Sequence, residues 1–414
     1  MKRHHPSTQT TLLHVTTVPF SFFFFTGQIG YMQHRGFEVH ALSSPGPLLT
    51  DFATRELVMV HAVNMLRQIS PLRDLVALAQ ICWNIRQISP TIVHAHTPKG
   101  GLLGTVAAWL MRAPVRVYHI RGLPFMTATG YRRVLLWWSE KIACTLAHQV
   151  LCVSHSIRDV AIEAGICPPD KIKVLLGGSG NGVDAMARFN PSRLDPTTGQ
   201  TMRQQYGIPA GALVIGFIGR IVRDKGIEEL VTAWQALRQE FPHIHLLVVG
   251  PFEPQDPVSQ DIEAVLRTDP QIHLVGEDWD TPRFYAAMDF LVLPTYREGF
   301  PNVPLEAASM ELPVVATRIP GCMDAIEADV TGILVPVQDA VALADGMRIY
   351  IQNSPLRRQH GLAGRQRVLT QFRQEAIWEA LYQEYALLLQ AKGFSVPDLP
   401  NQQLPSPETP ELTH

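Results

Sequence analysis

Short apolar runs alternate along the chain with longer segments in which apolar residues recur every three or four positions. The runs are typical of buried strands, and the longer recurrence predicts amphipathic helices. In the first half of the chain the runs fall at residues 12–18, 38–43, 57–63, 91–96, 115–120, 149–153 and 171–175. Strands and helices that alternate at this length indicate a parallel, doubly wound sheet.

Helices are expected between these strands, at about 27–35, 72–88, 101–111, 131–147 and 155–165. The 72–88 segment carries apolar residues on one face, and these are Leu72, Leu75, Val76, Ala79 and Trp83. Residues 19–26 contain four consecutive phenylalanines, which cannot all face one core. We interpret this stretch as a partly buried connection between a strand and a helix. The alternative is an apolar lip on a cleft.

The alternation stops at residues 177–198, which are rich in Gly, Pro, Ser, Asn and Asp, and then restarts. This composition predicts a linker between two domains. Strands follow at 213–219, 245–250, 290–294, 313–317 and 332–335, and helices at about 227–237, 258–267, 282–288, 341–352 and 374–389. The sequence therefore predicts α/β domains at 1–190 and 200–371, a last helix at 372–392 and a disordered tail at 393–414.

Composition fits two domains, since the chain has 414 residues and 46% of them are hydrophobic. The net charge of -2 argues against a protein that binds nucleic acid electrostatically. The five cysteines are scattered without C-x-x-C spacing, which favours a reducing cytoplasm. We expect no signal peptide and no membrane span, because no run reaches the roughly 20 apolar residues that a span needs.

One loop between a strand and a helix has the composition of a ligand site. The apolar run 290–294 is followed by R-E-G-F-P-N-V-P-L-E-A-A at 297–308, where Asn302 can cap a helix. The carboxyl end of a parallel strand and the amino end of a helix are where doubly wound sheets bind anions. Glu298 and Glu306 bracket the loop, so both can face one cleft. Alone, the pair could equally be two solvated glutamates.

A second loop carries basic residues. The sequence G-F-I-G-R-I-V-R-D-K-G at 216–226 ends a predicted strand, and Gly219 would let the backbone approach a ligand closely. Arg220 and Lys225, together with the helix that follows, make a site suited to a diphosphate. The alternative is a glycine turn with solvated basic side chains.

The string P-T-Y-R-E-G-F-P-N-V-P-L-E-A at 294–307 resembles the donor-binding motif of the family-4 retaining glycosyltransferases, which have the GT-B fold. The resemblance implies two Rossmann-like domains that face a cleft, with the last helix crossing back to an amino-terminal acceptor domain. It implies that Arg220 and Lys225 bind the donor diphosphate, that Glu306 contacts the ribose and that Glu298 contacts the sugar. The further donor-binding residues that it implies are Gly219, Phe300, Pro301, Asn302 and Val303.

The same resemblance implies an activity. The enzyme would transfer a sugar, with retention, from a nucleoside diphosphate sugar (a UDP-linked hexose or N-acetylhexosamine) to a lipid-linked saccharide in cell-surface polysaccharide synthesis. The nucleotide sugar is then a substrate, and no cofactor is expected. The alternatives are a nucleotide-sugar epimerase of the same fold and a catalytically silent partner that binds nucleotide sugars. The chain departs from the family's pattern at the phenylalanine run, which stands where the family usually has a Gly-Gly pair.

Two strand ends of the first domain point at the expected cleft. One carries His96 and Lys99, and the other carries His119 and Arg121. The family places a histidine near the donor sugar, and His119 is the closest match; the alternative is a packed histidine at a strand end. Lys99 and Arg121 could hold an acceptor phosphate, with His96 beside them.

We predict no metal site. Asp278 and Asp280 form a D-x-D triplet, but Asp280 precedes an expected helix and is interpreted as its cap. His94 and His96 alternate onto one face of a strand, as His243 and His245 do, but we expect no convincing third ligand near either pair.

Residues 131–138, Y-R-R-V-L-L-W-W, mix basic and aromatic side chains. This mixture is typical of a helix at a membrane surface, and a buried helix with a charged start is the alternative. The enzyme is therefore expected in the cytoplasm, with peripheral binding to the inner face of the cytoplasmic membrane as a hypothesis.

Overall fold

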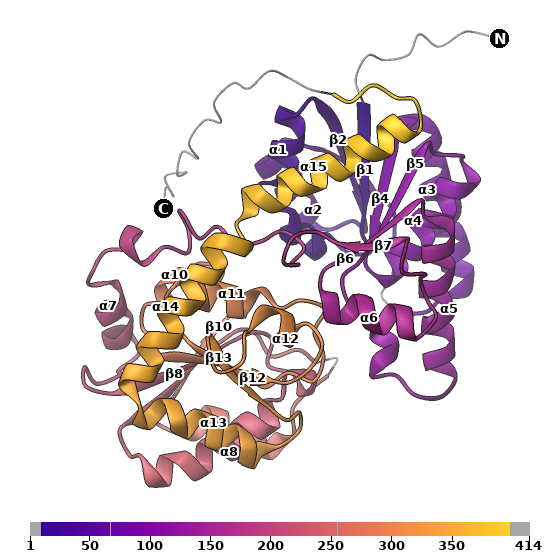
Figure 1. The fold of residues 1–414 in the computed structure, drawn as a ribbon. Helices are drawn as coiled ribbons and strands as arrows, with labels where there is room; N and C mark the ends of the chain where they lie inside the picture. The colour runs from indigo at the N-terminus through magenta and orange to yellow at the C-terminus, as the bar shows by residue number, and fades with distance from the viewer. Residues whose placement is uncertain (1–9, 67, 255, 398–414) are drawn as a thin grey trace, which may run out of the picture.

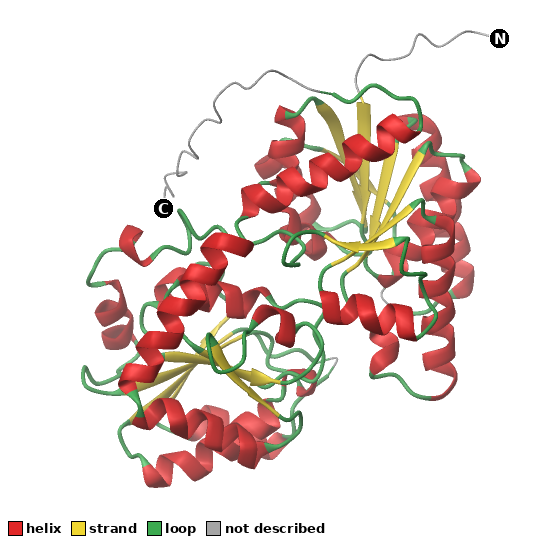
Figure 2. Cartoon of the chain, viewed as in Figure 1, coloured by secondary structure: helices red, strands yellow, loops and turns green. Residues whose placement is uncertain are grey.

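The computed structural model describes residues 10–66, 68–254 and 256–397, which form two lobes (Figure 1). Each lobe contains one parallel sheet covered by helices (Figure 2). The prediction of two doubly wound α/β units is confirmed. Of the tail predicted at 393–414, residues 398–414 lie outside the described residues.

The first lobe is built on a seven-stranded sheet. Its strands are β1 (Thr10–Val15), β2 (Phe37–Ser43), β3 (Met59–Ala62), β4 (Ile92–His96), β5 (Val115–Ile120), β6 (Gln149–Cys152) and β7 (Ile172–Val174). Their order in the sheet is β3-β2-β1-β4-β5-β6-β7. The chain changes direction across the sheet between β1 and β4, and doubly wound sheets bind ligands beyond the strand ends at such a switch point.

Helices cover both faces of this sheet, and alternate strand residues face each of them. One face packs against α1 (Gln28–His34), α2 (Pro47–Glu56) and the last helix, α15 (Gln374–Ala391). The other packs against α3 (Pro71–Ile88), α4 (Pro98–Leu110) and α5 (Gly130–Leu146). Helix α6 (His155–Glu163) follows β6 and shares a core with α5. On β1, for example, Leu12 joins the α15 side and Leu13 the α3 side.

The last helix belongs to the first lobe although it follows the second lobe in sequence. Its residues Leu381, Tyr385 and Leu389 are buried in one core with Leu12 and Phe37. Figure 1 shows this yellow helix lying across the strands of the first lobe. The expected crossing of the carboxyl-terminal helix is therefore confirmed.

The second lobe is built on a six-stranded sheet. Its strands are β8 (Leu213–Ile218), β9 (Ile244–Val249), β10 (Ile272–Gly276), β11 (Phe290–Leu293), β12 (Val314–Thr317) and β13 (Gly332–Val335). Their order is β10-β9-β8-β11-β12-β13, so the switch point lies between β8 and β11. Its helices are α7 (Thr198–Gln205), α8 (Ile227–Glu240), α9 (Gln260–Thr268), α10 (Pro282–Tyr285), α11 (Asn302–Ser309), α12 (Cys322–Ala325), α13 (Ala340–Gln352) and α14 (Ser354–Gln371).

The phenylalanine run forms a 3-10 helix, η1 (Pro19–Phe25), between β1 and α1. Phe22 and Phe25 are buried in the first lobe, as expected for a partly buried connection. Phe23 instead stacks on Trp279 of the second lobe, with ring centroids 5.0 Å apart. The run therefore divides its rings between the core and a contact between the lobes.

The apolar face of α3 points away from the sheet. Four of its large residues, Leu72, Leu75, Val76 and Trp83, are between 58% and 81% exposed. The core side of the helix is formed by a different row, Ala77, Ile81 and Ile85, which recur every four residues. The predicted helix is thus confirmed, but its most apolar stripe faces outward.

Candidate active site

The two loops singled out in the sequence follow neighbouring strands at the switch point of the second lobe. One follows β8 and contains Gly219, Arg220 and the short 3-10 helix η4 (Arg223–Lys225), after which α8 begins. The other follows β11 and leads into α11. Because β8 and β11 are paired, the carboxyl ends of both strands open at the same edge of the sheet.

Hydrogen bonds join these loops into one unit. The Asp224 carbonyl accepts from the Tyr296 backbone N–H at 2.9 Å and from the Thr295 hydroxyl at 3.2 Å. The Asp224 carboxylate pairs with Arg297 at 3.0 Å. Gly226 has φ 68°, and a Cβ there would lie 2.0 Å from the Pro294 carbonyl oxygen, so only glycine fits this approach.

The basic residues of the site are paired with carboxylates. Lys225 forms an ion pair with Glu298 in which both side chains are largely buried. Arg220 pairs with Glu253 at 2.6 Å and is more exposed. A diphosphate that bound these cations would therefore compete with two carboxylates, one of which is the glutamate predicted to contact the donor sugar.

Helix α11 begins at Asn302 rather than after it. The residue in the capping position is Pro301, and no side chain caps the helix, so the predicted cap at Asn302 is wrong. Asn302 instead lies at hydrogen-bond distance from Ser179, with 3.5 Å between their side-chain oxygens. The first turn of α11 thus keeps backbone N–H groups that no side chain satisfies, a property that suits an anion. The Phe300 ring just before it packs against Phe372.

Glu306 lies one turn into α11 and accepts a hydrogen bond of 2.9 Å from the Tyr285 hydroxyl. Burial is the main cause that raises the pKa of Glu306, and the bond from Tyr285 partly opposes it. Tyr285 also donates to the Val303 carbonyl at 3.4 Å. The tyrosine therefore fixes the orientation of this carboxylate.

The loop after β11 also touches the opposite lobe. The Gly299 carbonyl accepts from the Ser154 hydroxyl at 2.8 Å. A Cβ at Gly299 would lie 1.9 Å from the carbonyl oxygen of Arg121, so the two backbones are in direct contact. Nearby, Asp324 of α12 accepts from the backbone N–H groups of His155 and Ser156 at 2.9 and 3.2 Å. A carboxylate at the amino end of α6 is favourable because of the helix dipole.

The basic residues predicted for the first lobe are not in contact with each other. Lys99 pairs with Asp74 of α3 at 2.8 Å. The Arg121 guanidinium lies over the Phe25 ring, 4.5 Å from its centroid, and packs beside Gly180. Among the described residues, Arg121 has no carboxylate partner. It keeps its charge at neutral pH, since burial lowers its pKa only to about 10.

Four buried histidines lie on the α15 side of the first sheet. They are His14 on β1, His94 and His96 on β4, and His119 on β5. The expectation that His94 and His96 lack a third neighbour is wrong, because ring nitrogens of His14, His94 and His96 lie within 4.8 Å of one another. Burial lowers the pKa of His14 to about 3 and the pKa values of the others well below the usual range. All four rings are therefore neutral at physiological pH.

His119 stacks on His94 within this cluster, with ring centroids 5.4 Å apart. Its side chain is buried, so its predicted role beside the donor sugar stays a prediction. Arg121, which directly follows β5, is only half-buried by comparison. Sequence spacing could not have found His14, because it lies about 80 residues from His94 and becomes its neighbour only through the pairing of β1 with β4.

The D-W-D triplet has a structural environment. Asp278 and Asp280 both pair with Arg283, the second at 3.5 Å. Asp280 does not cap α10, because the residue in the capping position is Thr281 and no side chain caps that helix. The predicted cap is therefore wrong, although both aspartates are held by a neighbouring arginine.

Comparison with known proteins identifies the family. Residues 212–353 match the model described as glycosyl transferases group 1, and residues 25–178 match a glycosyl transferase 4-like domain. The capsular polysaccharide biosynthesis glycosyltransferase CapM of Staphylococcus aureus is 32% identical over 378 residues, which cover 91% of this chain and 97% of that protein. The chain is a group 1, GT4-like glycosyltransferase. The GT4 family is a retaining one.

A further relative is also a glycosyltransferase, and solved structures agree on the fold. The UDP-Gal:alpha-D-GlcNAc-diphosphoundecaprenol alpha-1,3-galactosyltransferase of Escherichia coli is 24% identical over 306 residues, covering 73% of this chain and 77% of that protein. The structure of HepE from Anabaena in complex with UDP-glucose has a TM-score of 0.75 at 20% identity. The match covers 92% of this chain and 100% of the HepE chain. WaaG, a glycosyltransferase of lipopolysaccharide biosynthesis, has a TM-score of 0.64 at 16% identity. The fold is GT-B.

The contact at Gly299 leads to a first prediction. In Gly299→Ala the new methyl group would clash with the Arg121 carbonyl oxygen, so the lobes must separate at this point. A displacement of about 1 Å in an active site can cost about a hundredfold in rate, and we expect a loss of glycosyl transfer of that order. Small-angle scattering should show a larger radius of gyration.

Gly30→Ala is the matched control for this test, because an added Cβ there meets no atom within 4 Å. It should keep both the activity and the radius of gyration of the parent. If Gly299→Ala did the same, the contact between the lobes would not control the site.

Proposed function

We propose that this glycosyltransferase moves a hexose or N-acetylhexosamine from a UDP-sugar to a hydroxyl of a lipid-linked saccharide, during synthesis of a cell-surface polysaccharide. The observation that carries the proposal is the joined pair of loops at the β8–β11 switch point, which brings Arg220, Lys225, Glu298 and Glu306 to one edge of the second sheet. The activity of the Escherichia coli relative and the UDP-glucose bound to HepE support the donor class and the acceptor class.

The chemistry follows from where charge develops. As the bond to the anomeric carbon breaks, the diphosphate gains negative charge. Arg220, Lys225 and the first turn of α11 would stabilise it, and preorganised donors of this kind are usually the largest catalytic contribution. Gly219, Phe300 and the α11 start would shape the pocket around the nucleotide. In this proposal the negative charge of Glu298 stabilises the sugar ring as it becomes positive. Glu298 is not proposed as a covalent nucleophile, because its carboxylate is paired with Lys225.

The donor is best identified by measuring slow hydrolysis of a panel of nucleotide sugars, followed by product analysis with a lipid-linked acceptor. We predict that turnover needs no divalent metal, since cationic side chains can neutralise the diphosphate. Activity should survive EDTA. Loss of activity in EDTA and recovery with manganese would contradict this prediction, and release of an epimerised sugar alone would favour an epimerase.

A further prediction separates the two glutamates. Glu306, held by Tyr285, is proposed to bind the ribose, a contact made equally in the ground state and the transition state. Glu306→Gln should therefore raise the KM for the donor more than it lowers kcat. Glu298 is proposed to oppose the positive charge that grows on the sugar ring. Glu298→Gln should therefore lower kcat and leave UDP affinity nearly unchanged.

Steady-state kinetics and UDP titration on both variants test this division. Glu263→Gln is the control, because Glu263 lies on the exposed surface of α9 and, among the described residues, forms an ion pair only with Arg267 four residues on. The same kinetic profile for both active-site variants would show that the division of roles is wrong.

We also propose that the first lobe docks on the inner face of the cytoplasmic membrane. Helix α5 has an outward stripe, with side chains between 40% and 87% exposed, formed by Tyr131, Val134, Leu135, Trp138 and Ile142. The stripe on α3 has the same spacing, i, i+3, i+4, i+7 and i+11. Both helices pack against α4, so α3 and α5 lie in one helical layer of the lobe (Figure 1). Two parallel apolar stripes of this kind suit burial in a lipid interface.

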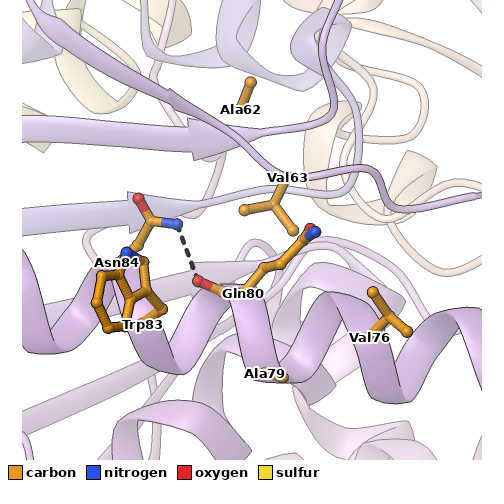
Figure 3. Close-up of a pocket in the computed structure, with 7 residues that line it drawn as sticks. All are labelled: Ala62, Val63, Val76, Ala79, Gln80, Trp83 and Asn84. Carbon is orange, nitrogen blue, oxygen red and sulfur yellow. Dashed lines mark hydrogen bonds between the residues drawn. The ribbon is translucent and has the colours of Figure 1, made fainter.

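Other features of this layer support the membrane as its partner. Exposed arginines accompany both stripes, Arg73 and Arg86 on α3 and Arg132 and Arg133 on α5, and would attract anionic lipid. A groove of about 410 Å³ lies between Trp83 of α3 and the end of β3 (Figure 3). Among the described residues, every helix is too short or too polar to cross a bilayer, so the proposal is of surface binding.

We expect the protein to sediment with anionic vesicles at low salt and to be released as salt rises. Leu75→Ser and Trp138→Ser should each weaken binding about ten- to a hundredfold, since burial of one large apolar side chain contributes about 1.5–3 kcal/mol. Val341→Ser, which changes an exposed apolar residue of the second lobe, should have no effect. Equal binding by all three variants would exclude this surface.

A further inference from the structure

The histidine cluster occupies the switch point of the first sheet. On the paired strands, His14 is level with His94, and His96 is level with His119, so all four rings share one face. Each ring is at most 5% exposed. Neutral imidazoles buried at a ligand-binding edge of a sheet need a reason, because each carries one donor and one acceptor that water can no longer satisfy.

Two of these histidines form a chain of hydrogen bonds with Arg121. The Arg121 Nε–H donates to His96 Nδ1 at 3.4 Å, and His96 Nε2 lies 3.0 Å from His14 Nδ1. A guanidinium can only donate, so His96 Nδ1 accepts and the ring proton of His96 sits on Nε2. That proton is donated to His14 Nδ1. The chain ends at His14 Nε2–H, which has no partner among the described residues.

Arg121 stands where the lobes meet. Its carbonyl touches Gly299, and its guanidinium lies between the Phe25 ring and Gly180, where a Cβ would be 2.2 Å from Nη1. Arg121 has no ion pair among the described residues, in contrast to Arg220 and Lys225. A desolvated cation without a counter-ion is costly and is ready to bind an anion.

We propose that His96 and His14 are positioning residues, which hold the Arg121 guanidinium in place for a phosphate group in the cleft. The inference rests on the proposed function, which brings two sources of phosphate to this point, the diphosphate of the donor and the diphosphate of a lipid-linked acceptor. His96 fixes the Nε side of the guanidinium, and the two Nη atoms are left for the ligand. His14 fixes the ring tautomer of His96 from behind.

A metal ion held by His14, His94 and His96 is the competing interpretation, since their ring nitrogens are close enough to share one. Arg121 argues against it. A divalent cation would lie next to a desolvated guanidinium, and no carboxylate of the described residues contacts any of the three rings. The ion would also need the lone pair of His96 Nε2, which carries the proton when Arg121 donates to Nδ1.

A double-mutant cycle tests the proposal. His96→Leu removes the acceptor for Arg121 and should lower kcat/KM about ten- to a hundredfold, the effect of losing one hydrogen bond to a charged group. His96→Asn keeps an acceptor near the position of Nδ1 and should recover most of that loss. In an Arg121→Gln background, His96→Leu should have almost no further effect, because His96 acts through Arg121. Additive losses would overturn the proposal.

His61→Leu is the structural control. It breaks another pair of histidines in the same lobe, His40 and His61, whose ring nitrogens are 2.9 Å apart on β2 and β3. The control should keep kcat/KM. If His61→Leu and His96→Leu lost activity in proportion to equal losses of thermal stability, His96 would be merely structural and the proposal would fail.

Binding experiments identify the source of the phosphate and remain informative if no donor sugar is found. UDP and geranyl diphosphate are titrated into the full-length protein and into its Arg121→Gln and His96→Leu variants. Weaker binding of geranyl diphosphate alone assigns the acceptor, and weaker binding of UDP alone assigns the donor. Unchanged affinity for both would overturn the proposal, as would one equivalent of metal per chain that disappears in His96→Leu. The parent protein could turn over no donor while Arg121→Gln and His96→Leu still bind a diphosphate more weakly than it does. That result would refute the proposed function and keep the positioning role.

Discussion

The site depends on a backbone contact between the lobes at Gly299. One short loop is hydrogen-bonded on its own side to the Asp224 loop and on the other side to Ser154, and it touches the Arg121 carbonyl. A side chain at this point would separate the lobes, so the width of the cleft is set by van der Waals contact between main chains. Glu298, the residue before Gly299, is thereby placed at a fixed distance from both sheets.

Charge pairing adds a second constraint. The two cations of the donor loops, Arg220 and Lys225, are each held by a carboxylate, whereas Arg121 across the cleft is held by neutral groups. A buried ion pair costs desolvation energy but keeps both side chains in one geometry. When an anion replaces a carboxylate, the cation needs little reorientation. The site therefore combines preorganised positive charge with little net charge before ligand binds.

The fold was readable from the sequence because the buried strands are continuous apolar runs at βα spacing. Elements without that signal were missed. Helix α14 buries mainly His360, Gly361, Gly364 and Val368, and its remaining surface is polar, so no apolar recurrence marks it. Strand β10 lies at the sheet edge and is only half-buried. Periodicity also located the apolar face of α3, but it cannot tell whether a face points to the core or to solvent.

The donor loops could be predicted because each is a local string next to a strand. Features that depend on distant segments could not be predicted in this way. His14 joins the histidine cluster through the pairing of β1 with β4. Asp324 caps α6 from the other lobe, and Phe23 stacks on Trp279 across the cleft. The start of α11 was misplaced by one residue, which turned Asn302 from a cap into the first helical position.

The position of α15 has a consequence for synthesis on the ribosome. The first lobe emerges first, but one side of its core contains Leu381, Tyr385 and Leu389, which are translated near the end. Until then Leu12 and its neighbours lack their cover, whereas the second lobe has a continuous core of its own. The first lobe is therefore synthesised first, but its core can be completed only after α15 has been translated.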